Sequence, residues 1–294
     1  MTLRSRVFTL EDLGFLRTLI ADHPDASRAE LARMACSAWN WLQPNGQLKE
    51  MGCKVAMLTL HRAGLLTLPP PKHVAPQQRK RASQPRPHTP EGDPQEPITQ
   101  PVSDLMPIRL ELVTRKTTSL WNELIDRYHY LGYTILRGAQ LRYLISSSRG
   151  YVAAIGFASP AWKTRDRDAW IGWDESTRTR NLHYIVNNTR FLILPWVSSK
   201  NLASKILSLC AKKLPTDWEE RYGYRPVLFE TFVEQERFAG TCYRAANWIH
   251  VGQTTGRGKW EQKGEHKVRA PLAIKDIFVY PLQRNYEIVL KDDS

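Results

Sequence analysis

Two short, strongly apolar segments with a helical segment between them constrain the fold of this chain most. Residues 191–197 and 226–233 have the length and composition of strands that are buried on both faces. Between them, residues 201–214 carry apolar side chains at a helical spacing, and residues 238–248 predict a second helix. The order strand, helix, strand, helix predicts an α/β domain whose centre is the stretch from residue 180 to residue 248.

Polar side chains are attached to these apolar segments, and this mixture indicates a site. Glu230 interrupts the second apolar strand, and a carboxylate at such a position needs a partner or a task. The remaining polar residues of the stretch are Asn181, Asn187, Asn188, Arg190, Tyr243 and Arg244. We therefore expect a functional site within this central stretch.

Charge is the feature of the composition that bears most on function. Lys+Arg 42 against Asp+Glu 29 gives a formal net charge of +13, and the sequence pI is about 9.7. A surplus of this size favours a polyanionic partner, with nucleic acid first. The alternative is a charge that only keeps the surface solvated. The 294 residues, of which 42% are hydrophobic, suffice for one large domain or two smaller ones.

Cysteine spacing and hydropathy bear on the compartment. The four cysteines, Cys36, Cys53, Cys210 and Cys242, form no Cys-x-x-Cys pair, which indicates reduced residues rather than a disulfide or zinc framework. The sequence has no apolar run of the roughly 18 residues that a membrane span requires. Its N-terminus has no signal-peptide pattern. We therefore expect a cytoplasmic protein without a membrane partner.

Residues 1–68 predict a small helical module that binds DNA. Thr9 caps a first helix, a Ser-Arg-Ala-Glu capping box at residues 27–30 starts a second, and residues 47–63 predict a third. Residues 65–68 predict a short strand. Three helices and an extended tail indicate a winged helix-turn-helix, whose third helix enters the major groove; the alternative is a helical protein-interaction module. The basic residues that would meet phosphates or guanine edges are Lys49, Lys54 and Arg62.

The rest of the chain divides after a proline-rich stretch. Residues 69–107 hold more than half of the 19 prolines and almost no large apolar residues, which predicts a disordered linker. Residues 108–294 predict a mixed α/β (α+β) domain with a largely antiparallel front half, including a hairpin around the Ser-Ser-Arg-Gly turn at residues 147–150. Residues 162–170, which are charged and aromatic, predict a loop.

The end of the central stretch resembles the acyltransferases of the GNAT superfamily. Many of these read Asn-x-x-Ala-x-x-x-Tyr-x-x-x-Gly-Phe after their fifth strand, and residues 236–248 are similar to that motif. The resemblance implies a GNAT-like mixed sheet, and it places Tyr243 on the tyrosine that serves as general acid. Such enzymes bind the cofactor pyrophosphate with a glycine-rich turn, whereas residues 197–204 contain no glycine. Because glycine lets backbone amides approach a phosphate closely, its absence argues against acetyl-CoA as a cofactor.

A longer resemblance covers nearly the whole chain. It rests on the motifs at residues 45–49, 64–69, 128–133, 141–144, 170–173, 187–195, 230–233 and 240–248. In these motifs the chain resembles the DruA-like family, which includes a component of the Druantia anti-phage systems and related domains of transposon-encoded proteins. The resemblance implies antiviral defence or transposition, with other defence or transposon proteins as partners. It assigns no residue a catalytic role.

The first functional hypothesis is DNA strand processing, meaning nicking by a nuclease activity, strand transfer or recombination. A tyrosine hydroxyl can attack a phosphodiester and hold the strand covalently, if cations stabilise the phosphorane and another group takes the proton. Glu230 is the candidate base or Mg²⁺ ligand. Tyr128 and Tyr130 are rival nucleophiles, and a purely structural buried tyrosine is the alternative. The catalytic candidates are Tyr243, Glu230, His129, Arg190 and Asn188.

Two further hypotheses stay open, so that the sequence does not decide whether the protein is an enzyme. One is an acyl-CoA-dependent transferase, as the GNAT-like scaffold implies. The other is a DNA-binding module without chemistry, whose cations contact phosphates and whose tryptophans stack on bases; ordinary surface charge is the alternative for each cation. Single- or double-stranded DNA is the expected partner, and a homodimer is left open. Beyond the first module, the nucleic-acid candidates are Arg165, Arg167, Trp170, Trp173, Arg180, Arg244, Arg257 and Lys259.

Overall fold

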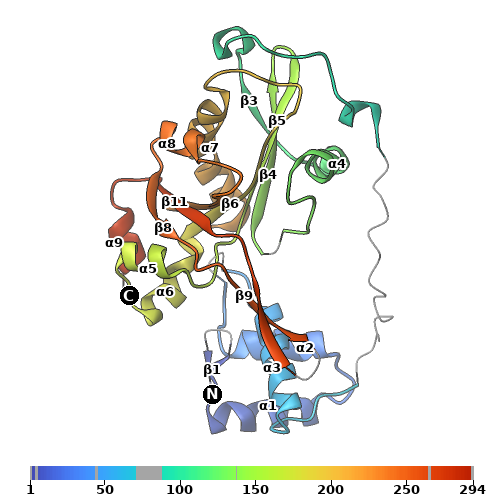
Figure 1. The fold of residues 1–294 in the computed structure, drawn as a ribbon. Coiled ribbons are helices and arrows are strands. Elements are labelled where there is room, and N and C mark those ends of the chain that lie inside the picture. Colours follow the sequence, from blue (N-terminus) through green and yellow to red (C-terminus); the bar gives the residue numbers. More distant parts are fainter. Residues whose placement is uncertain are drawn as a thin grey trace. The chain divides into compact units, whose positions relative to one another are not determined.

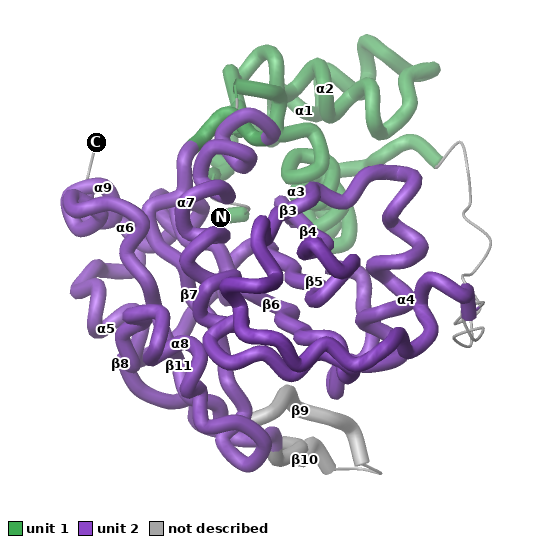
Figure 2. The backbone as a smooth tube through the Cα atoms, turned by 90° about the horizontal axis from the view of Figure 1, so that it is seen from above, with its two compact units in different colours: residues 1–85, 222–224 green, residues 86–221, 225–294 purple. Residues whose placement is uncertain are grey.

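The computed structural model describes two compact units, which are residues 1–85 with 222–224 and residues 86–221 with 225–294 (Figure 2). For Thr2 and for residues 257–263 and 266–271, the backbone alone is described. The described residues are 2–3, 6–43, 46–70, 88–136, 138–263 and 266–292.

The first unit is built from three helices. They follow a short strand pair, and the elements are β1 (Thr2–Leu3), β2 (Arg6–Val7), α1 (Leu10–Asp22), α2 (Arg28–Ala38) and α3 (Glu50–Arg62). The predicted caps are confirmed, with a capping box at Thr9 and another at Ser27. In each box the hydroxyl accepts a hydrogen bond from the backbone three residues on, and the carboxylate at that position accepts one from the cap backbone.

The apolar faces of these helices meet in one core, in which Leu31 and Leu60 are fully buried. Residues 65–68, which were expected to form a strand, do not form one. Instead, the side chains of Leu66 and Leu68 are buried in the same core, so burial rather than strand pairing holds this segment. The three predicted helices are therefore confirmed. The winged helix is not confirmed and stays a prediction, because residues 65–68, which were expected to form its wing strand, form no strand.

The second unit is organised around one mixed sheet of seven strands (Figure 1). Strands β6 and β7 pair in parallel, and the other neighbours in this sheet pair antiparallel. The expected mixed α/β fold with an antiparallel front half is confirmed. In spatial order the strands are β3 (Arg109–Leu112), β4 (Gln140–Ser147), β5 (Gly150–Ala158), β6 (Ile185–Ile193), β7 (Leu228–Glu234), β11 (Lys275–Pro281) and β8 (Ile249–Gln253).

Helices cover both faces of this sheet. Arg142 of β4 donates a hydrogen bond to Asn122 of α4, whereas the next residue, Tyr143, donates to Asp217 of α7. Neighbouring strand residues point to opposite faces, so α4 and α7 lie on opposite sides. The other elements of the unit are η1 (Pro90–Gly92), η2 (Val102–Leu105), α4 (Thr118–Tyr128), α5 (Arg165–Ile171), α6 (Glu175–Asn181), η3 (Leu182–Tyr184), α7 (Leu202–Tyr222), α8 (Thr241–Ala245), α9 (Tyr286–Lys291) and the separate hairpin of β9 (Arg257–Lys263) and β10 (His266–Pro271).

Part of the predicted disordered linker is ordered. In residues 88–107, the backbone N–H and the hydroxyl of Thr89 donate to the carboxylate of Glu123 on α4, at 2.9 and 2.8 Å. Ile98 forms a β-bridge with the chain just after β6. High proline content did not prevent folding here, because contacts with the sheet domain fix the segment. Residues 71–87 of the predicted linker lie outside the described residues.

Within the central stretch, the bounds of several elements differ from the prediction. Strand β6 begins at Ile185, ahead of the expected 191–197, so that Asn187 and Asn188 lie inside the strand. The expected loop at residues 162–170 contains helix α5, and the expected helix at residues 238–248 is reduced to the five residues of α8. The start of β6 was missed because polar side chains are unusual inside a buried strand, and their hydrogen-bond partners are known only from the folded sheet.

Candidate functional site: a cleft between two parallel strands

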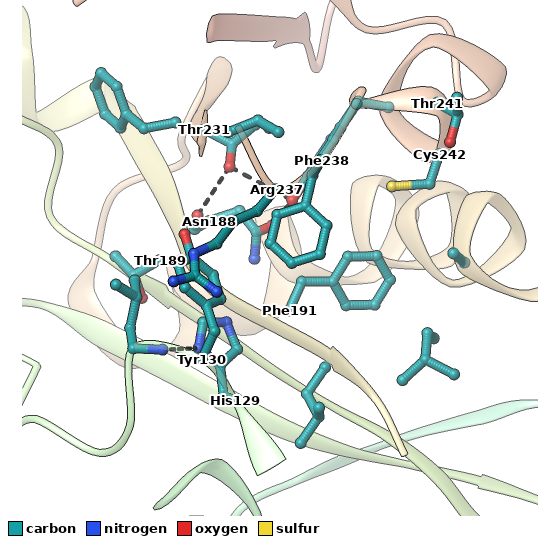
Figure 3. Close-up of a pocket in the computed structure, with 18 of the residues that line it drawn as sticks. His129, Tyr130, Asn188, Thr189, Phe191, Thr231, Arg237, Phe238, Thr241 and Cys242 are labelled. Atoms are coloured by element: carbon teal, nitrogen blue, oxygen red, sulfur yellow. Dashed lines mark hydrogen bonds between the residues drawn. The ribbon is translucent and has the colours of Figure 1, made fainter. Parts of the chain in front are cut away.

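A cleft opens where β6 and β7 stop pairing. Their parallel register runs from Ile185 opposite Leu228 to Asn188 opposite Thr231, and both strands continue beyond it. A β-bulge in β6 between Asn188 and Arg190, against β5, lies at the same point. Bulges bend a strand and redirect its side chains, so this one helps β6 turn away from β7. The resulting cavity has a volume of about 540 Å³ (Figure 3).

A hydrogen-bonded group of three side chains forms the polar part of the cleft. The Tyr243 hydroxyl donates to Asn188 Oδ1 at 2.8 Å. Thr231 Oγ1 donates to the Asn188 carbonyl at 3.1 Å (Figure 3). The Asn188 amide nitrogen donates to the carbonyls of Gly156 and Arg190, at 3.1 Å each. These two bonds fix the orientation of the amide, so that its oxygen, which can only accept, faces Tyr243 and receives the hydroxyl proton.

Tyr243 is held by packing as well as by these hydrogen bonds. Its ring packs against Phe278, at 5.8 Å between centroids, and against Trp248, at 5.1 Å, and its side chain is only 8% exposed in total. Burial raises the pKa of the Tyr243 hydroxyl far above its usual value, so the group is protonated at neutral pH. Its partners among the described residues, Asn188 and Thr231, are not bases. This environment does not activate Tyr243 as a nucleophile.

His129 and Arg190 lie together beside the cleft. His129 Nδ1 accepts a hydrogen bond from the backbone N–H of Leu131, at 3.2 Å, which places the ring proton on Nε2. Burial, together with the Arg190 guanidinium, lowers the pKa of His129 to about 4, so the imidazole is neutral at pH 7. Arg190 donates to the carbonyls of Gly132 and Thr189 and to the hydroxyl of Thr134. These contacts fix the loop that carries His129.

Glu230 does not join this group. It precedes Thr231 in β7 and therefore points to the other face of the sheet. There it accepts hydrogen bonds from Arg167 at 2.7 Å and from the Ala161 backbone at 2.8 Å, and both Glu230 and Arg167 are fully buried. The expected adjacency of Glu230 and Tyr243 is therefore not found. No cluster of three or more His, Cys, Asp or Glu side chains suited to a metal ion occurs among the described residues.

The other nucleic-acid candidates of this unit are dispersed. Arg167 is sealed inside the protein by Glu230 and Asp168, out of reach of a phosphate. Trp170 stacks on Tyr286, at 5.6 Å between ring centroids, and the Trp173 indole nitrogen donates a hydrogen bond to Asp168. Each tryptophan is therefore already engaged by a side chain of the protein. Three candidates remain exposed: Arg165, whose partner is Asp166, Arg180, which contacts Thr177, and Arg244, whose guanidinium lies 5.1 Å from the Phe278 ring.

Further candidates lie elsewhere. The side chains of Arg257 and Lys259 are outside the described residues. In the first unit, Arg62 is exposed at the end of α3, while Lys49 and Lys54 are half-buried. The Lys49 Nζ atom lies 5.9 Å from the centre of the Trp41 ring, which belongs to the core of the first unit. The three therefore stay candidates on α3 and at its start.

Several residues at the cleft and on the surface were not predicted as ligand contacts. Thr231 completes the polar group, and Phe238 and Arg237 line the cleft beside Tyr130. The Phe238 ring is 49% exposed, which is unusual for a large aromatic side chain. Trp162, 60% exposed, lies in the segment before α5. The sequence carried one signal for them, a run of charged and aromatic residues in short connecting segments.

A second cavity adjoins the cleft at the start of α7. It has a volume of about 530 Å³, and Ile193 and Ala203 line both cavities. The turn before α7 was expected to lack the conformational freedom of glycine. Asn201 nevertheless adopts a φ of +66°, the left-handed region that asparagine tolerates better than most residues. Ser199 Oγ, in the same turn, is buried without a hydrogen-bond partner in the described part of the chain.

Comparisons with known proteins agree with the family resemblance. The family model described as "Druantia protein DruA" matches residues 59–268. No curated protein matches the chain. Solved structures to which the chain is similar include three acetyltransferases. One is aminoglycoside acetyltransferase AAC(6')-Ib in complex with coenzyme A (TM-score 0.39, 13% identity, 59% of this chain and 94% of that one). The others are polyamine N-acetyltransferase from Drosophila melanogaster (0.37, 9%, 59% and 99%) and a probable acetyltransferase from Staphylococcus epidermidis (0.36, 7%, 59% and 98%). Likenesses of this size carry no argument about activity. Among the described residues, no helix has the length and hydropathy to cross a membrane.

Proposed function

Because this chain belongs to the DruA family, whose description is that of a Druantia protein, we propose that it is the DNA-binding component of an anti-phage defence system. The observation that carries the proposal is the charge. Lys and Arg exceed Asp and Glu by 13 over the whole chain. Such a surplus attracts a polyanion and releases its counterions on binding. The Druantia membership points to phage or host DNA as that polyanion.

One exposed surface segment has the composition of a nucleic-acid contact. Trp162 is 60% exposed, and Lys163 and Arg165 follow it as exposed cations. The Arg178 guanidinium lies 5.8 Å from the Trp162 ring and supports it from behind. An aromatic ring between cations is the usual arrangement for stacking a base while holding the backbone. We therefore propose this segment, rather than Trp170 and Trp173, as the stacking surface.

Binding without strand cleavage is the form of this function that the geometry favours. The Tyr243 hydroxyl has a raised pKa, donates its proton to an amide and, in the part of the chain that the structure describes, has no hydrogen bond to a carboxylate. A nucleophile of that kind lacks the base that would take its proton. Cleavage of DNA by this chain would require another residue, such as Tyr130, or another protein of the system.

The proposal is tested with the full-length chain and short DNA duplexes and single strands. We expect a shift in gel mobility or in fluorescence anisotropy whose affinity falls steeply with salt, and supercoiled plasmid that stays intact with and without magnesium. Trp162→Ala should weaken single-strand binding by roughly 5- to 150-fold, the usual range for loss of one stacked base. Ile288→Ala, which shortens a 72% exposed apolar residue on α9, is the matched control and should bind as the wild type does. Salt-independent or absent binding would refute the proposal.

A second candidate function is acyl transfer from an acyl-CoA, and one observation favours it. Asn201 supplies the positive φ that a glycine would otherwise give to the turn before α7, and the orphaned Ser199 Oγ lies in that turn. These residues and the N-terminal amides of α7 could hold a pyrophosphate. A bound acyl-CoA would supply the acyl group as a thioester, and coenzyme A would leave as the thiol. A rise of the melting temperature with coenzyme A that is lost in Ser199→Ala and in Asn201→Pro, with no rise from DNA, would favour this function over the first.

A further inference from the structure

We infer that the cleft between β6 and β7 binds one unpaired nucleobase that carries an exocyclic amino group. This inference rests on the proposed function, because the base would belong to the DNA that the protein binds. The base is the part of that DNA that would occupy the cleft. The strands of a duplex keep their bases stacked inside, so the base must come from a single strand or be turned out of the duplex.

The mouth of the cleft offers flat apolar faces. The rings of Phe238 and Tyr130 lie 5.3 Å apart and are 49% and 37% exposed, although both line the cavity (Figure 3). His129 stacks on Tyr130 at 4.9 Å, and the Arg237 guanidinium lies 5.3 Å from the same ring. Exposed aromatic rings grouped around a cavity indicate a ligand that covers them. A planar ring with an adjacent anion fits rings and a guanidinium together.

The polar part of the cleft selects among planar ligands. Tyr243 gives its proton to Asn188, so its oxygen faces a ligand as an acceptor. Thr231 has one hydroxyl proton, and its contact with the Asn188 carbonyl is 3.1 Å against 3.5 Å to Tyr243, which leaves that acceptor open. His129, in turn, presents an Nε2–H donor because its Nδ1 accepts from the backbone. An acceptor and a donor of this kind match an exocyclic amino group and a ring nitrogen.

The size of the cavity agrees with this occupant. A volume of about 540 Å³ lies within the range of sites for small molecules, roughly 300 to 1,000 Å³, and accommodates a nucleotide. Adenine, cytosine and guanine carry the required amino group, and thymine does not. The cleft should therefore discriminate against thymine.

The experiment uses the full-length chain and a short single strand that carries one 2-aminopurine, a fluorescent adenine analogue. We expect its fluorescence to change on binding, and dAMP to compete for the cleft better than dTMP. Phe238→Ala should lower the affinity for both the oligonucleotide and dAMP by roughly 5- to 150-fold, because one stacking face is lost. The residue is half exposed, so the variant should fold, which circular dichroism checks. Ile288→Ala serves again as the control outside the cleft.

The outcomes separate this inference from the proposed function. Wild-type affinity of Phe238→Ala for both dAMP and the oligonucleotide would overturn the nucleobase site, as would equal competition by dTMP. Duplex and single-strand binding that persists in that variant would leave the proposed function intact. Conversely, a chain that binds dAMP through Phe238 but binds no DNA would support the base site and refute the proposed function.

Discussion

The two faces of β7 use neighbouring polar residues in opposite ways. Glu230 is fully buried, and both of its carboxylate oxygens are engaged by Arg167 and the Ala161 backbone. One residue later, Thr231 faces a cavity of about 540 Å³ together with Tyr243 and Asn188. The first face is closed by an ion pair, and the second is open to a ligand. A polar residue in an apolar strand therefore indicates a ligand site only if it faces a cavity and is not already paired with another buried group.

The largest expected effect is on the closed face. Arg167→Ala would leave Glu230 buried without its cation, and burial already raises the pKa of this carboxyl group. Loss of one partner of a buried ion pair costs about 3–5 kcal/mol. We expect the free energy of unfolding, measured by urea denaturation, to fall by about that amount. A cleft that still binds its ligand in the folded fraction would confirm that the two faces act separately.

Two further variants control this measurement. Arg165→Ala removes an arginine of the same helix whose side chain is 76% exposed, and we expect little change in stability. Arg167→Met combined with Glu230→Leu should destabilise less than Arg167→Ala, because no fully buried carboxylate is left without its cation. Asp168, whose side chain is 13% exposed, loses its bond to Arg167 in both variants. If Arg167→Ala proves as stable as Arg165→Ala, the closed face is not held by the ion pair.

A smaller effect is expected where α8 begins, on the open face. Gly240 has a φ of +68°, and a Cβ there would lie 2.8 Å from the ring of Phe278, which packs against Tyr243. Gly240→Ala should lower the free energy of unfolding by about 1–3 kcal/mol, through backbone strain and displacement of that ring. Gly150→Ala is the matched control, since its φ of +101° is also positive but no atom lies within 4 Å of the added Cβ. Equal losses in both variants would show that the Phe278 contact is unimportant.

Much of the scaffold could be predicted from the sequence. The capping boxes at Thr9 and Ser27, the hairpin of β4 and β5 and the buried strand β7 depend on local pattern, and each is present. That the segment around Thr89 is ordered could not be predicted. Its contact with Glu123 depends on tertiary packing, whereas composition indicates only the local preference for secondary structure.

The site was only partly predictable, for a physical reason. Tyr243 and Asn188, 55 residues apart, were both candidates, and the sheet brings their side chains within 2.8 Å. Glu230 was a candidate for the same group, but the period of two along a strand sends it to the opposite face from Thr231. Deciding which of two consecutive residues faces the cleft requires the register of β7 on β6, which sequence pattern did not give.

The contribution of Tyr243 to the open face is expected to be smaller still. Tyr243→Phe removes the donor to Asn188 Oδ1 and leaves a buried acceptor unpaired, at a cost of about 1 kcal/mol in unfolding free energy. Tyr128→Phe, whose hydroxyl donates to the Gly92 carbonyl at 2.9 Å, removes a comparable bond outside the polar group. Thermal unfolding should show similar losses in both, and weakened dAMP binding should follow from Tyr243→Phe. Unchanged dAMP binding would remove the tyrosine oxygen from the ligand contacts.

The last prediction concerns pH and His129, and it distinguishes the open face from the closed one. The folded chain holds the pKa of His129 at about 4 against an ordinary 6.5, first through burial and then through the charge of Arg190. The unfolded chain therefore takes up a proton at this residue at higher pH than the folded chain does. The contribution of His129 to stability is complete above about pH 6.5 and is lost as the pH falls toward 4.

The measurement compares the wild type with His129→Gln. The titration of the carboxyl groups is common to the two proteins, so the difference between their unfolding free energies isolates the imidazole. That difference should move in favour of the variant between about pH 7 and about pH 5. Parallel profiles for the two proteins over this interval would mean that His129 is as accessible to protons in the folded chain as in the unfolded one, and that the open face does not desolvate it.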